Sequence, residues 1–345
     1  MGTTPRNLIR SALRSINALG IDGSPDSDQH QDALEDLNML LDSWSADELL
    51  PSDFVQKSFA LTANKTNYTI GDSTVAEDRD GISVAQAVDS ATNLTITGAL
   101  ASDGSVTFDV PRHVTIYGSG DSSAMYFTVT GTNTYGDTIA EQITGPNNST
   151  VYGRKQFKTV TQVASSAAAT GNIEVGSDSV IDTRRPLMIV SAFVRDISGN
   201  DYPCYPSTRE RYNIQTDKDV TTTSGSEITQ VYYDRTYPTG EIYVYKVPSV
   251  STFTMYIDMW QPFQQITSAT IDTDINLSGE YIRALKWNLA TELAPDYGKN
   301  VPEVVFVKGE STLTTIKRIN TRQPKPSILS QPFSVVDGQP AVNKN

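Results

Sequence analysis

Residues 33–44 have the sequence ALEDLNMLLDSW, and residues 281–294 have the sequence YIRALKWNLATELA. In both stretches apolar side chains recur every three or four positions, which predicts an amphipathic α-helix. A helix with one apolar stripe must bury that stripe against another element. One stretch lies near the start of the chain and the other near its end. We therefore expect the two ends to pack together and the segment between them to form an insertion.

The N-terminal stretch has a second helical segment before it. Thr4 and Pro5 fit an N-cap and a first helical position, and apolar residues follow at helical spacing as far as Gly20. A loop with glycine and proline then separates this helix from the next, which begins near Ser27. Residues 4–48 are therefore expected to form a helical hairpin.

The C-terminal stretch has the same organisation. Ser278 fits an N-cap, and Glu280 places a negative charge in the first turn, where the helix dipole favours it. Pro302 begins a further helical segment with apolar residues at intervals of three and four. Residues 278–320 are therefore expected to form a second hairpin.

Between the helical ends the period changes to that of β-strands. Phe59 and Leu61 alternate with polar residues, as do Tyr68 and Ile70, which predicts a β-hairpin. Residues 83–178 then contain short apolar stretches separated by glycine-containing turns, and this spacing predicts an immunoglobulin-like sandwich without a disulfide. The strands expected there are Leu94–Thr97, Val106–Val110, Val114–Tyr117, Tyr126–Thr130, Thr138–Ile143, Phe157–Val163 and Asn172–Val175.

Residues 184–266 have a different composition, with tyrosines throughout. Regular alternation predicts strands at Ile242–Val247 and Phe253–Met259. Alternating aromatic residues usually stabilise a sheet by packing across strands, and this interpretation is favoured here. A face that stacks on carbohydrate is the alternative.

The composition limits the classes of partner. The 345 residues carry a net charge of −13, whereas proteins that grip nucleic acid through its phosphates are usually basic. We therefore expect most of the surface to repel DNA.

Neither an apolar signal core nor a run of about 18 apolar residues is present, so neither a secretion signal nor a membrane span is expected. Cys204 is the single cysteine, and we expect a buried thiol.

Few residues are candidates for chemistry. His30 lies among polar residues at the start of a helix, and His113 is expected at a strand edge; neither has a second metal ligand three or four positions away. The acidic segments 78–81 and 272–274 lack the ligand spacing of a calcium loop. The sequence therefore predicts no catalytic residue, no cofactor and no metal site.

The C-terminal tail differs from the rest of the chain. Beyond Asn320 it is rich in proline, glutamine and asparagine, and its approach has a basic bias. Such a segment has no core of its own, and its apolar residues often dock onto a neighbour. The tail and its approach therefore provide the candidate partner-binding residues, which are Arg318, Arg322, Lys325, Ile328, Leu329 and Phe333.

Several segments resemble the head-to-tail adaptor family of tailed bacteriophages, whose members are also called tail accessory, head-completion or packaged-DNA stabilisation proteins. On the N-terminal side the similar segments are Leu8–Arg14 with Ile21, and Ala33–Trp44. On the C-terminal side they are Leu277–Tyr281, Ala284–Leu285, Asn288–Ala290 and Leu293–Gly298. Between them, Tyr68–Gly71 and Arg184–Leu187 resemble strands of simpler relatives, and Phe127–Asn133 resembles immunoglobulin-like modules of virion proteins.

Together, the helix pattern and the resemblance imply an α+β fold. We expect a four-helix bundle built from the N- and C-terminal helical hairpins, with a large β insertion that includes the immunoglobulin-like sandwich. The expected parts are a helical core at 1–50 and 275–320, a β-sheet domain at 51–82 and 179–274, the sandwich at 83–178, and an extended C-terminal arm at 321–345.

The resemblance also implies a function. Members of the family form rings of identical subunits, typically twelve, between the portal and the tail, where they extend the DNA channel and help to retain packaged DNA. The implied partners are the portal, which the C-terminal arm would reach, tail nozzle or tail-fibre proteins, and further copies of the chain. DNA would pass through without specific binding. The protein would be made in the host cytoplasm and located at the head–tail junction of the virion, and no membrane is involved.

Two alternatives remain at the level of sequence. A carbohydrate-binding or adhesin protein would use the tyrosine-rich sheet as its binding face. A cell-wall hydrolase would need a pair of carboxylates that only the fold brings together. Either would require a cleft or face of converging side chains that an adaptor does not need.

Overall fold

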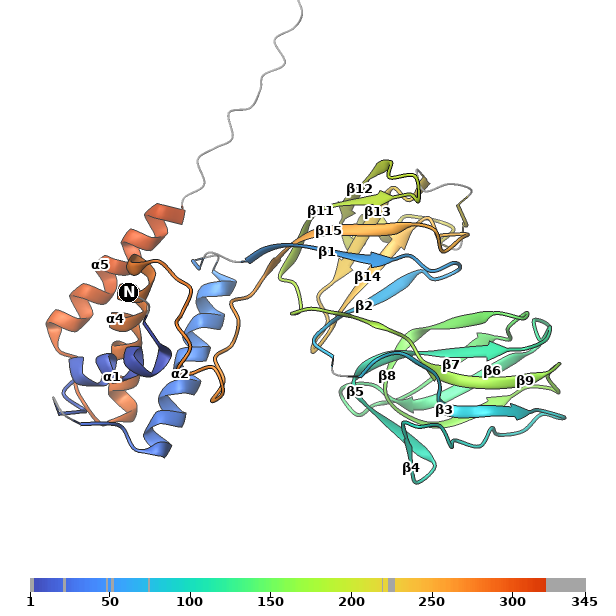
Figure 1. Cartoon of the computed structure of the whole chain (residues 1–345), viewed down its shortest axis with the longest axis horizontal. Helices are drawn as coiled ribbons and strands as arrows, with labels where there is room; N and C mark the ends of the chain where they lie inside the picture. Colours follow the sequence, from blue (N-terminus) through green and yellow to red (C-terminus); the bar gives the residue numbers. More distant parts are fainter. Residues whose placement is uncertain are drawn as a thin grey trace, which may run out of the picture. The chain divides into compact units, whose positions relative to one another are not determined.

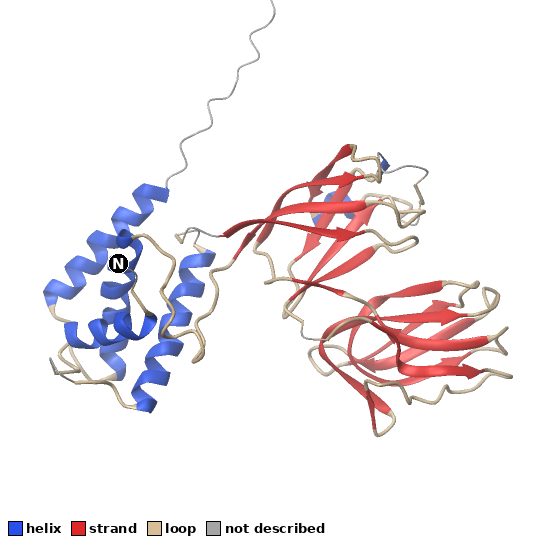
Figure 2. Cartoon of the chain, in the orientation of Figure 1, coloured by secondary structure: helices blue, strands red, loops and turns tan. Residues whose placement is uncertain are grey.

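The computed structural model describes residues 3–20, 23–47, 49–50, 53–73, 75–218, 220–222 and 227–320. The chain divides into two compact units. Met1–Leu50 and Gln265–Asn345 form the first, called the helical unit here, and Pro51–Gln264 form the second, called the β unit. Figure 1 shows the helices from the N-terminal end, in blue, together with those from the C-terminal end, in orange and red, and Figure 2 shows the strands in the other unit.

Side chains cap the N-termini of the first two helices of the chain. The elements of the helical unit are α1 (Pro5–Ser15), α2 (Ser27–Ala46), α4 (Gly279–Asp296) and α5 (Glu303–Asn320). Thr4 Oγ1 accepts a hydrogen bond from the backbone N–H of Asn7 at 3.3 Å, so the predicted cap of α1 is confirmed. Asp26 and Gln29 form a capping box at the start of α2, with reciprocal bonds of 2.8 and 3.3 Å.

Helix α4 is the central element of the helical unit. It packs against α1, α2 and α5, and α1 packs more extensively against α4 than against α2. The apolar stripes of both stretches quoted at the outset are buried here, and each large apolar side chain so buried contributes about 1.5–3 kcal/mol. Buried side chains of this core include Leu8, Ile9, Leu13, Leu34, Leu37, Leu41, Leu285, Leu289 and Leu293.

Two side chains attach the returning C-terminal segment to the N-terminal helices. Asn38 of α2 donates to the carbonyl of Ile266 at 2.9 Å and accepts from its N–H at 2.8 Å. Arg6 of α1 forms a bidentate ion pair with Asp272, at 2.5 and 2.9 Å. These contacts join residues more than two hundred positions apart, so the two ends of the chain fold as one unit.

Carboxylates gather where α2 lies against the end of α4. Burial, followed by the charge and hydrogen bond of Asp296 and the charges of Asp32 and Glu35, raises the pKa of Asp36 to about 6. Burial and the charge of Asp36 also raise the pKa of Glu292. We call these five residues the acidic patch.

The first sheet of the β unit has eight strands. In sheet order they are β1 (Asp53–Ala60), β15 (Thr254–Gln261), β11 (Met188–Arg195), β12 (Asp201–Ser207), β13 (Gln230–Asp234), β14 (Gly240–Tyr245), β2 (Asn67–Gly71) and β10 (Val180–Asp182). The pairs β12–β13 and β2–β10 are parallel, and the other pairs are antiparallel.

This sheet nearly closes on itself. Strands β1 and β2 are separated by five strands in the sheet order, yet the rings of Phe59 and Tyr68 lie 5.0 Å apart between centroids. Apolar residues from both ends of the order share one core. A sheet whose distant strands meet across one core has the curvature of a barrel.

The expected β-hairpin between Phe59 and Ile70 is wrong. Strand β1 pairs with β15, and β2 pairs with β14 and β10. The connection between β1 and β2 bonds instead to the segment before β15, since Leu61 N–H donates to Phe253 O and Asn64 N–H donates to Pro248 O, each at 2.8 Å. The alternation of apolar residues was sufficient to predict both strands but not which strands they pair with.

The second sheet of the β unit has seven strands. Its main path is β3 (Asp78–Ala87), β9 (Asn172–Ser177), β5 (Ser105–Gly118), β8 (Thr150–Ser165), β6 (Tyr126–Thr132) and β7 (Thr138–Thr144), and β4 (Ala101–Ser102) pairs with β5. Two of these strands are long, 14 residues in β5 and 16 in β8, and register shifts interrupt their pairing. Long strands with such irregularities can bend and follow the curve of a sheet.

The expected immunoglobulin-like sandwich is also wrong. A sandwich has two separate sheets that face each other, whereas here one hydrogen-bonded path encloses a single core. Two strands expected separately, Val106–Val110 and Val114–Tyr117, are parts of β5. Leu94–Thr97 forms no strand: Leu94 and Ile96 are buried in the core, and an isolated bridge at Asn93 holds the segment.

The fold class expected from the sequence, a four-helix bundle with an immunoglobulin-like insertion, is therefore corrected. The chain is mostly β, with 38% strand and 24% helix, and it includes a nearly closed, barrel-like sheet. The described residues form five helices, of which the short α3 (Arg209–Asn213) lies in the β unit. The error arose because long helices produce a strong periodic signal, whereas short strands produce weak ones whose pairing depends on distant residues.

The acidic patch leads to a prediction about stability. A carboxyl group whose folded pKa is raised stabilises the fold below its unfolded pKa, near 3.9, and this contribution is lost as pH rises through about 6 for Asp36. We therefore expect D36N to raise the melting temperature of the helical unit at pH 7.5 and to have little effect at pH 4. Circular dichroism at 222 nm measures it, because four of the five described helices lie in this unit. A D36N stabilisation as large at pH 4 as at pH 7.5 would contradict the assignment.

Candidate functional site: a buried charged junction in the β unit

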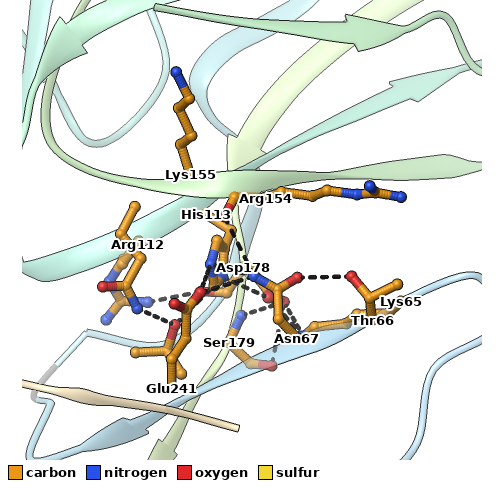
Figure 3. Close-up of polar contacts among 12 residues, drawn as sticks. Lys65, Thr66, Asn67, Arg112, His113, Arg154, Lys155, Asp178, Ser179 and Glu241 are labelled. Atoms are coloured by element: carbon orange, nitrogen blue, oxygen red, sulfur yellow. Dashed lines mark hydrogen bonds and ion pairs between the residues drawn. The ribbon is translucent and has the colours of Figure 1, made fainter. Parts of the chain in front are cut away.

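The chain passes between the two sheets of the β unit twice, and these two crossings lie together. It leaves the eight-stranded sheet after Gly71 and enters β3 at Asp78; it leaves β9 after Ser177 and enters β10 at Val180. The side chain of Arg112 donates to Ser73 and Val75 of the first linker and to Asp178 of the second, so the two linkers lie close together. Around them lies a cluster of buried charged and polar side chains from both sheets (Figure 3).

Asp178, in the second linker, is the central anion of the junction. Both of its carboxylate oxygens lie 2.6 Å from Lys65 Nζ, and the side chains of both residues are only 3% exposed. Lys65 belongs to the segment that precedes β2, so this ion pair joins the eight-stranded sheet to the end of β9. The Lys65 ammonium also lies 4.5 Å from the ring centroid of Tyr68.

His113 of β5 is the central cation. Its Nε2 lies 2.6 Å from Glu241 Oε1 of β14, and its Nδ1 lies 3.8 Å from Asp178 Oδ2, an ion-pair distance. Asn67 Nδ2 donates to the same Glu241 oxygen at 2.8 Å, and Tyr243 donates to the other at 2.5 Å. Figure 3 shows His113, Asn67 and Glu241 converging from three strands of the two sheets.

Arg112 binds both linkers at once. It is fully buried, and its guanidinium donates to the carbonyl of Asp178 at 3.0 Å, to Ser73 Oγ at 2.5 Å and to the carbonyl of Val75. Its Nε forms an ion pair with Asp109 at 3.2 Å. A planar group with five donors is suited to this task, because it can hold two passing chain segments in one geometry.

The junction determines the protonation of its members. Burial lowers the pKa of His113, but the hydrogen bonds and charges of Asp178 and Glu241 outweigh burial and raise that pKa to about 9. Burial raises the pKa of Asp178 and of Glu241, but the hydrogen bond and charge of His113 outweigh it, so both pKa values lie below their usual range. At neutral pH, His113 is therefore an imidazolium between two carboxylates.

The cluster is balanced in charge and has its ionic groups paired. Three cations face three carboxylates, namely Lys65, Arg112 and His113 with Asp109, Asp178 and Glu241. Burial of charges is tolerated when each is paired and hydrogen-bonded, and the removal of one member then leaves an uncompensated charge. This arrangement holds two sheets together. His113 is already protonated at neutral pH, so it cannot act as a general base there.

A polar cavity of about 350 Å³ lies beside the junction. Its lining residues are Glu77, Arg79, Thr115, Thr150, Tyr152, Ser177 and Asp178. The Ser177 hydroxyl is buried without a hydrogen-bond partner among the described residues, and it lines this cavity. A polar space of this size is large enough for ordered water.

The cavity lacks the features of a glycosidase site. Two carboxylates line it, Glu77 and Asp178. A paired-carboxylate hydrolase needs one carboxyl group that stays protonated near neutral pH. The pKa of Asp178 is lowered, because its hydrogen bond to His113 and the charge of Lys65 outweigh the opposing effect of burial. Asp178 is therefore fixed as a structural anion, and the cavity does not support hydrolysis by this pair.

The tyrosine-rich segment is used largely for internal packing. Tyr212, Tyr232 and Tyr243 contact one another, with ring centroids 5.5–5.7 Å apart, and Tyr212 and Tyr232 are less than 9% exposed. Tyr205 and Tyr237 are exposed, at 64% and 73%. The stacked rings therefore stabilise the sheet and are not presented as a platform for a sugar ring.

The residues predicted from the sequence to bind a partner lie at or beyond the end of α5. Arg318 is exposed in the last turn of α5, next to Lys317. The other five predicted residues lie outside the described residues; they are Arg322, Lys325, Ile328, Leu329 and Phe333. Arg318, the one member of the set among the described residues, belongs to the helical unit, whereas the buried junction belongs to the β unit.

The two histidines and the single cysteine lie in three different environments. His30 accepts a hydrogen bond from Arg6 Nη1 at 3.3 Å, and burial and the charge of Arg6 lower its pKa. The expectation that His113 lies at a strand edge is wrong, because β5 lies between β9 and β8. Cys204 is buried as expected, and burial raises the pKa of its thiol to about 12.

The members of the junction could not be recognised as a group from the sequence. Lys65, Asp178 and Glu241 are far apart in the sequence and form no motif. One local signal was present: Arg112 and His113 are adjacent between the apolar residues Val110 and Val114, and adjacent charged residues in a strand are costly to bury unless paired. That signal indicates a buried ionic partner but does not identify it.

Comparisons with known proteins add no assignment, because neither a protein-family model nor a curated protein matches the chain. None of the described helices is long and apolar enough to span a bilayer. Within the described ranges, no group of three or more histidine, cysteine, aspartate and glutamate side chains is placed to hold a metal ion.

The protonation of His113 leads to a pH prediction. A histidine with a raised folded pKa contributes stability that is complete below its unfolded pKa, near 6.5, and is lost as pH rises through about 9. Calorimetry between pH 6 and 10 should therefore show the transition of the β unit shifting to lower temperature on the alkaline side. H113Q should lower stability at pH 7 and lack this alkaline decline. H30Q is the matched control, because the pKa of His30 is lowered and its removal should leave the alkaline limb unchanged.

The Lys65–Asp178 pair gives a second prediction. Removal of one partner from a buried ion pair typically costs about 3–5 kcal/mol, because the other charge stays buried and unpaired. We expect K65M to lower the free energy of unfolding of the β unit by that amount in a urea titration. K57M, at a half-buried position of β1, should change it by less than about 0.5 kcal/mol. If the K65M variant were as stable as K57M, the Lys65–Asp178 pair would not contribute to the free energy of unfolding.

Proposed function

We propose that the protein is a non-enzymatic structural subunit of a virion, an adaptor between the portal and the tail that extends the DNA channel. The observation that supports this proposal is the organisation of the chain. Its first 50 residues and its residues from 265 onward share one compact unit, and residues 51–264 form the other. The segments that resemble the adaptor family at both ends thus belong to the same helical unit.

The construction of the β unit supports a mechanical role. Three buried cations pair with three carboxylates, of which Asp178 and Glu241 are buried, and these pairs fix the two linkers between its sheets. A joint of this kind suits a part that must keep its shape within an assembly. The ionisable groups at its centre are paired with one another, so they are not available for acid–base catalysis.

The charge of the chain supports a channel that DNA passes without being held. Each subunit carries −13 charges, and a ring multiplies this number. A narrow bore focuses the resulting field, so phosphates are repelled from the wall. A bore that bound DNA would retard its passage, whereas a repulsive bore leaves the DNA free to move.

The direct test uses the portal encoded by the same genome as the chain. The purified protein is mixed with the portal ring, and native mass spectrometry measures the mass of the complex. A ring of adaptor subunits added to the portal supports the proposal, whether or not the protein is monomeric alone. Absence of binding, together with absence of the protein from purified virus particles, would overturn it.

The C-terminal arm leads to a prediction within this proposal. Deletion of residues 321–345 should abolish binding to the portal, because this segment contains five of the six predicted portal-binding residues. The fold should survive, because the described core lies entirely within residues 3–320. Thermal unfolding checks the fold, and co-sedimentation with portal rings measures binding. Retention of full portal binding by the deletion variant would contradict the role of the arm.

A further inference from the structure

The helical unit contains a cluster of cations that have no carboxylate partner among the described residues. The ammonium groups of Lys286 and Lys308 both lie over the ring of Trp287, 4.6 and 4.5 Å from its centroid. Arg283 lies one turn before Trp287 on α4. None of the ion pairs among the described residues includes any of these three cations. We call Arg283, Lys286, Trp287 and Lys308 the basic patch.

The basic patch borders a cavity of about 410 Å³ between α1 and α4. Ile282 and Trp287 provide apolar walls, and Arg283 and Lys286 provide charge at the same cavity. Burial and the charge of Lys308 lower the pKa of Lys286, so the two ammonium groups disfavour each other. An anionic group placed here would relieve that repulsion, and an apolar side chain beside it would fill the cavity.

The acidic patch has the complementary design. Asp32 and Glu35 are exposed on α2, Asp36 is half-buried, and Met39 follows on the same face with 61% of its surface exposed. Burial, and after it the charges of Asp296, Asp32 and Glu35, raises the pKa of Asp36, so the neighbouring carboxylates repel it. The patch therefore offers an exposed apolar side chain beside several anions, whereas the basic patch offers an apolar cavity beside several cations.

One copy of the chain cannot bring its own two patches together. Arg283 and Glu292 are nine positions apart on α4, which is about 2.5 turns of helix, so they project from opposite sides. Complementary surfaces on opposite sides of one unit can meet only between different molecules. Head-to-tail contacts of this kind generate a ring when the rotation closes.

We infer that the acidic patch of one copy, with Met39, docks onto the basic patch and the Trp287 cavity of a second copy of this chain. This inference rests on the proposed function, because it identifies the surfaces through which adaptor subunits would contact one another. The exposed apolar side chain of Met39 favours an acidic helix of another copy over DNA as the occupant, because a phosphate backbone has no apolar group to fill the cavity beside Trp287.

The test is a charge exchange measured by sedimentation of the full chain at low ionic strength. The wild-type protein should self-associate, and added salt should weaken the association. K286E/K308E and D32K/E35K should each weaken it by about tenfold or more, because each places like charges opposite one another. The chain with all four substitutions should associate again, since the signs are then exchanged and complementary.

Matched controls separate this contact from general charge effects and from misfolding. R235E/K299E changes the net charge as much as K286E/K308E does, at two exposed positions outside the patches, and should associate like wild type. Helical circular dichroism checks each fold. An equimolar mixture of K286E/K308E with D32K/E35K should form mixed complexes even though neither variant associates alone, which a misfolded variant could not do.

Several outcomes would overturn the inference. A wild-type chain that stays monomeric at about 1 mM protein and low salt would do so, as would a fourfold variant that fails to associate although it is folded. Binding of duplex DNA that K286E/K308E abolishes would assign the basic patch to nucleic acid. Failure of the proposed function is distinguishable, because it would be seen as absence from the virus particle while the charge exchange still governs self-association.

Discussion

The buried pair of Asp178 with Lys65, extended by His113 and Glu241, is the constraint on which the β unit depends. Asp178 occupies the linker between the two sheets, and Lys65 and Glu241 come from the eight-stranded sheet, whereas His113 comes from the seven-stranded one. If these charges were unpaired, desolvation would drive the sheets apart or draw water between them. Because they are paired, the two linkers cross at one fixed place, and the sheets on either side keep one relative arrangement within the unit.

Charge is distributed differently in the helical unit. There the acidic patch and the basic patch each gather like charges, which costs stability in an isolated subunit near neutral pH. A folded protein keeps such a cost when the charges serve another purpose, most simply a complementary surface on another molecule. The β unit thus neutralises its charges internally, whereas the helical unit leaves them for an external partner.

Local features of the fold could be predicted from the sequence, and long-range ones could not. Thr4 at the start of α1 and the apolar stripe from Ala33 to Trp44 depend on residues a few positions apart, and the structure has both. The pairing of β1 with β15, or the continuity of β5 across Pro111, depends on partners that no local period reveals. For the same reason the junction around Asp178 was missed, since its members are separated by up to 176 positions between Lys65 and Glu241 and share no spacing.

A four-helix bundle would by itself have suggested a bore lined by helices, but the chain is mostly β, so its fold class alone does not indicate such a bore. Two observations support the adaptor proposal. The two ends of the chain form one compact unit, and in that unit Arg283 and Glu292 project from opposite sides of α4. A catalytic protein needs neither feature, and it needs free ionisable groups at a cleft, whereas here the cavity beside Asp178 is bordered by a carboxylate that two cations already hold. Self-complementary charge together with an occupied polar centre favours assembly over chemistry.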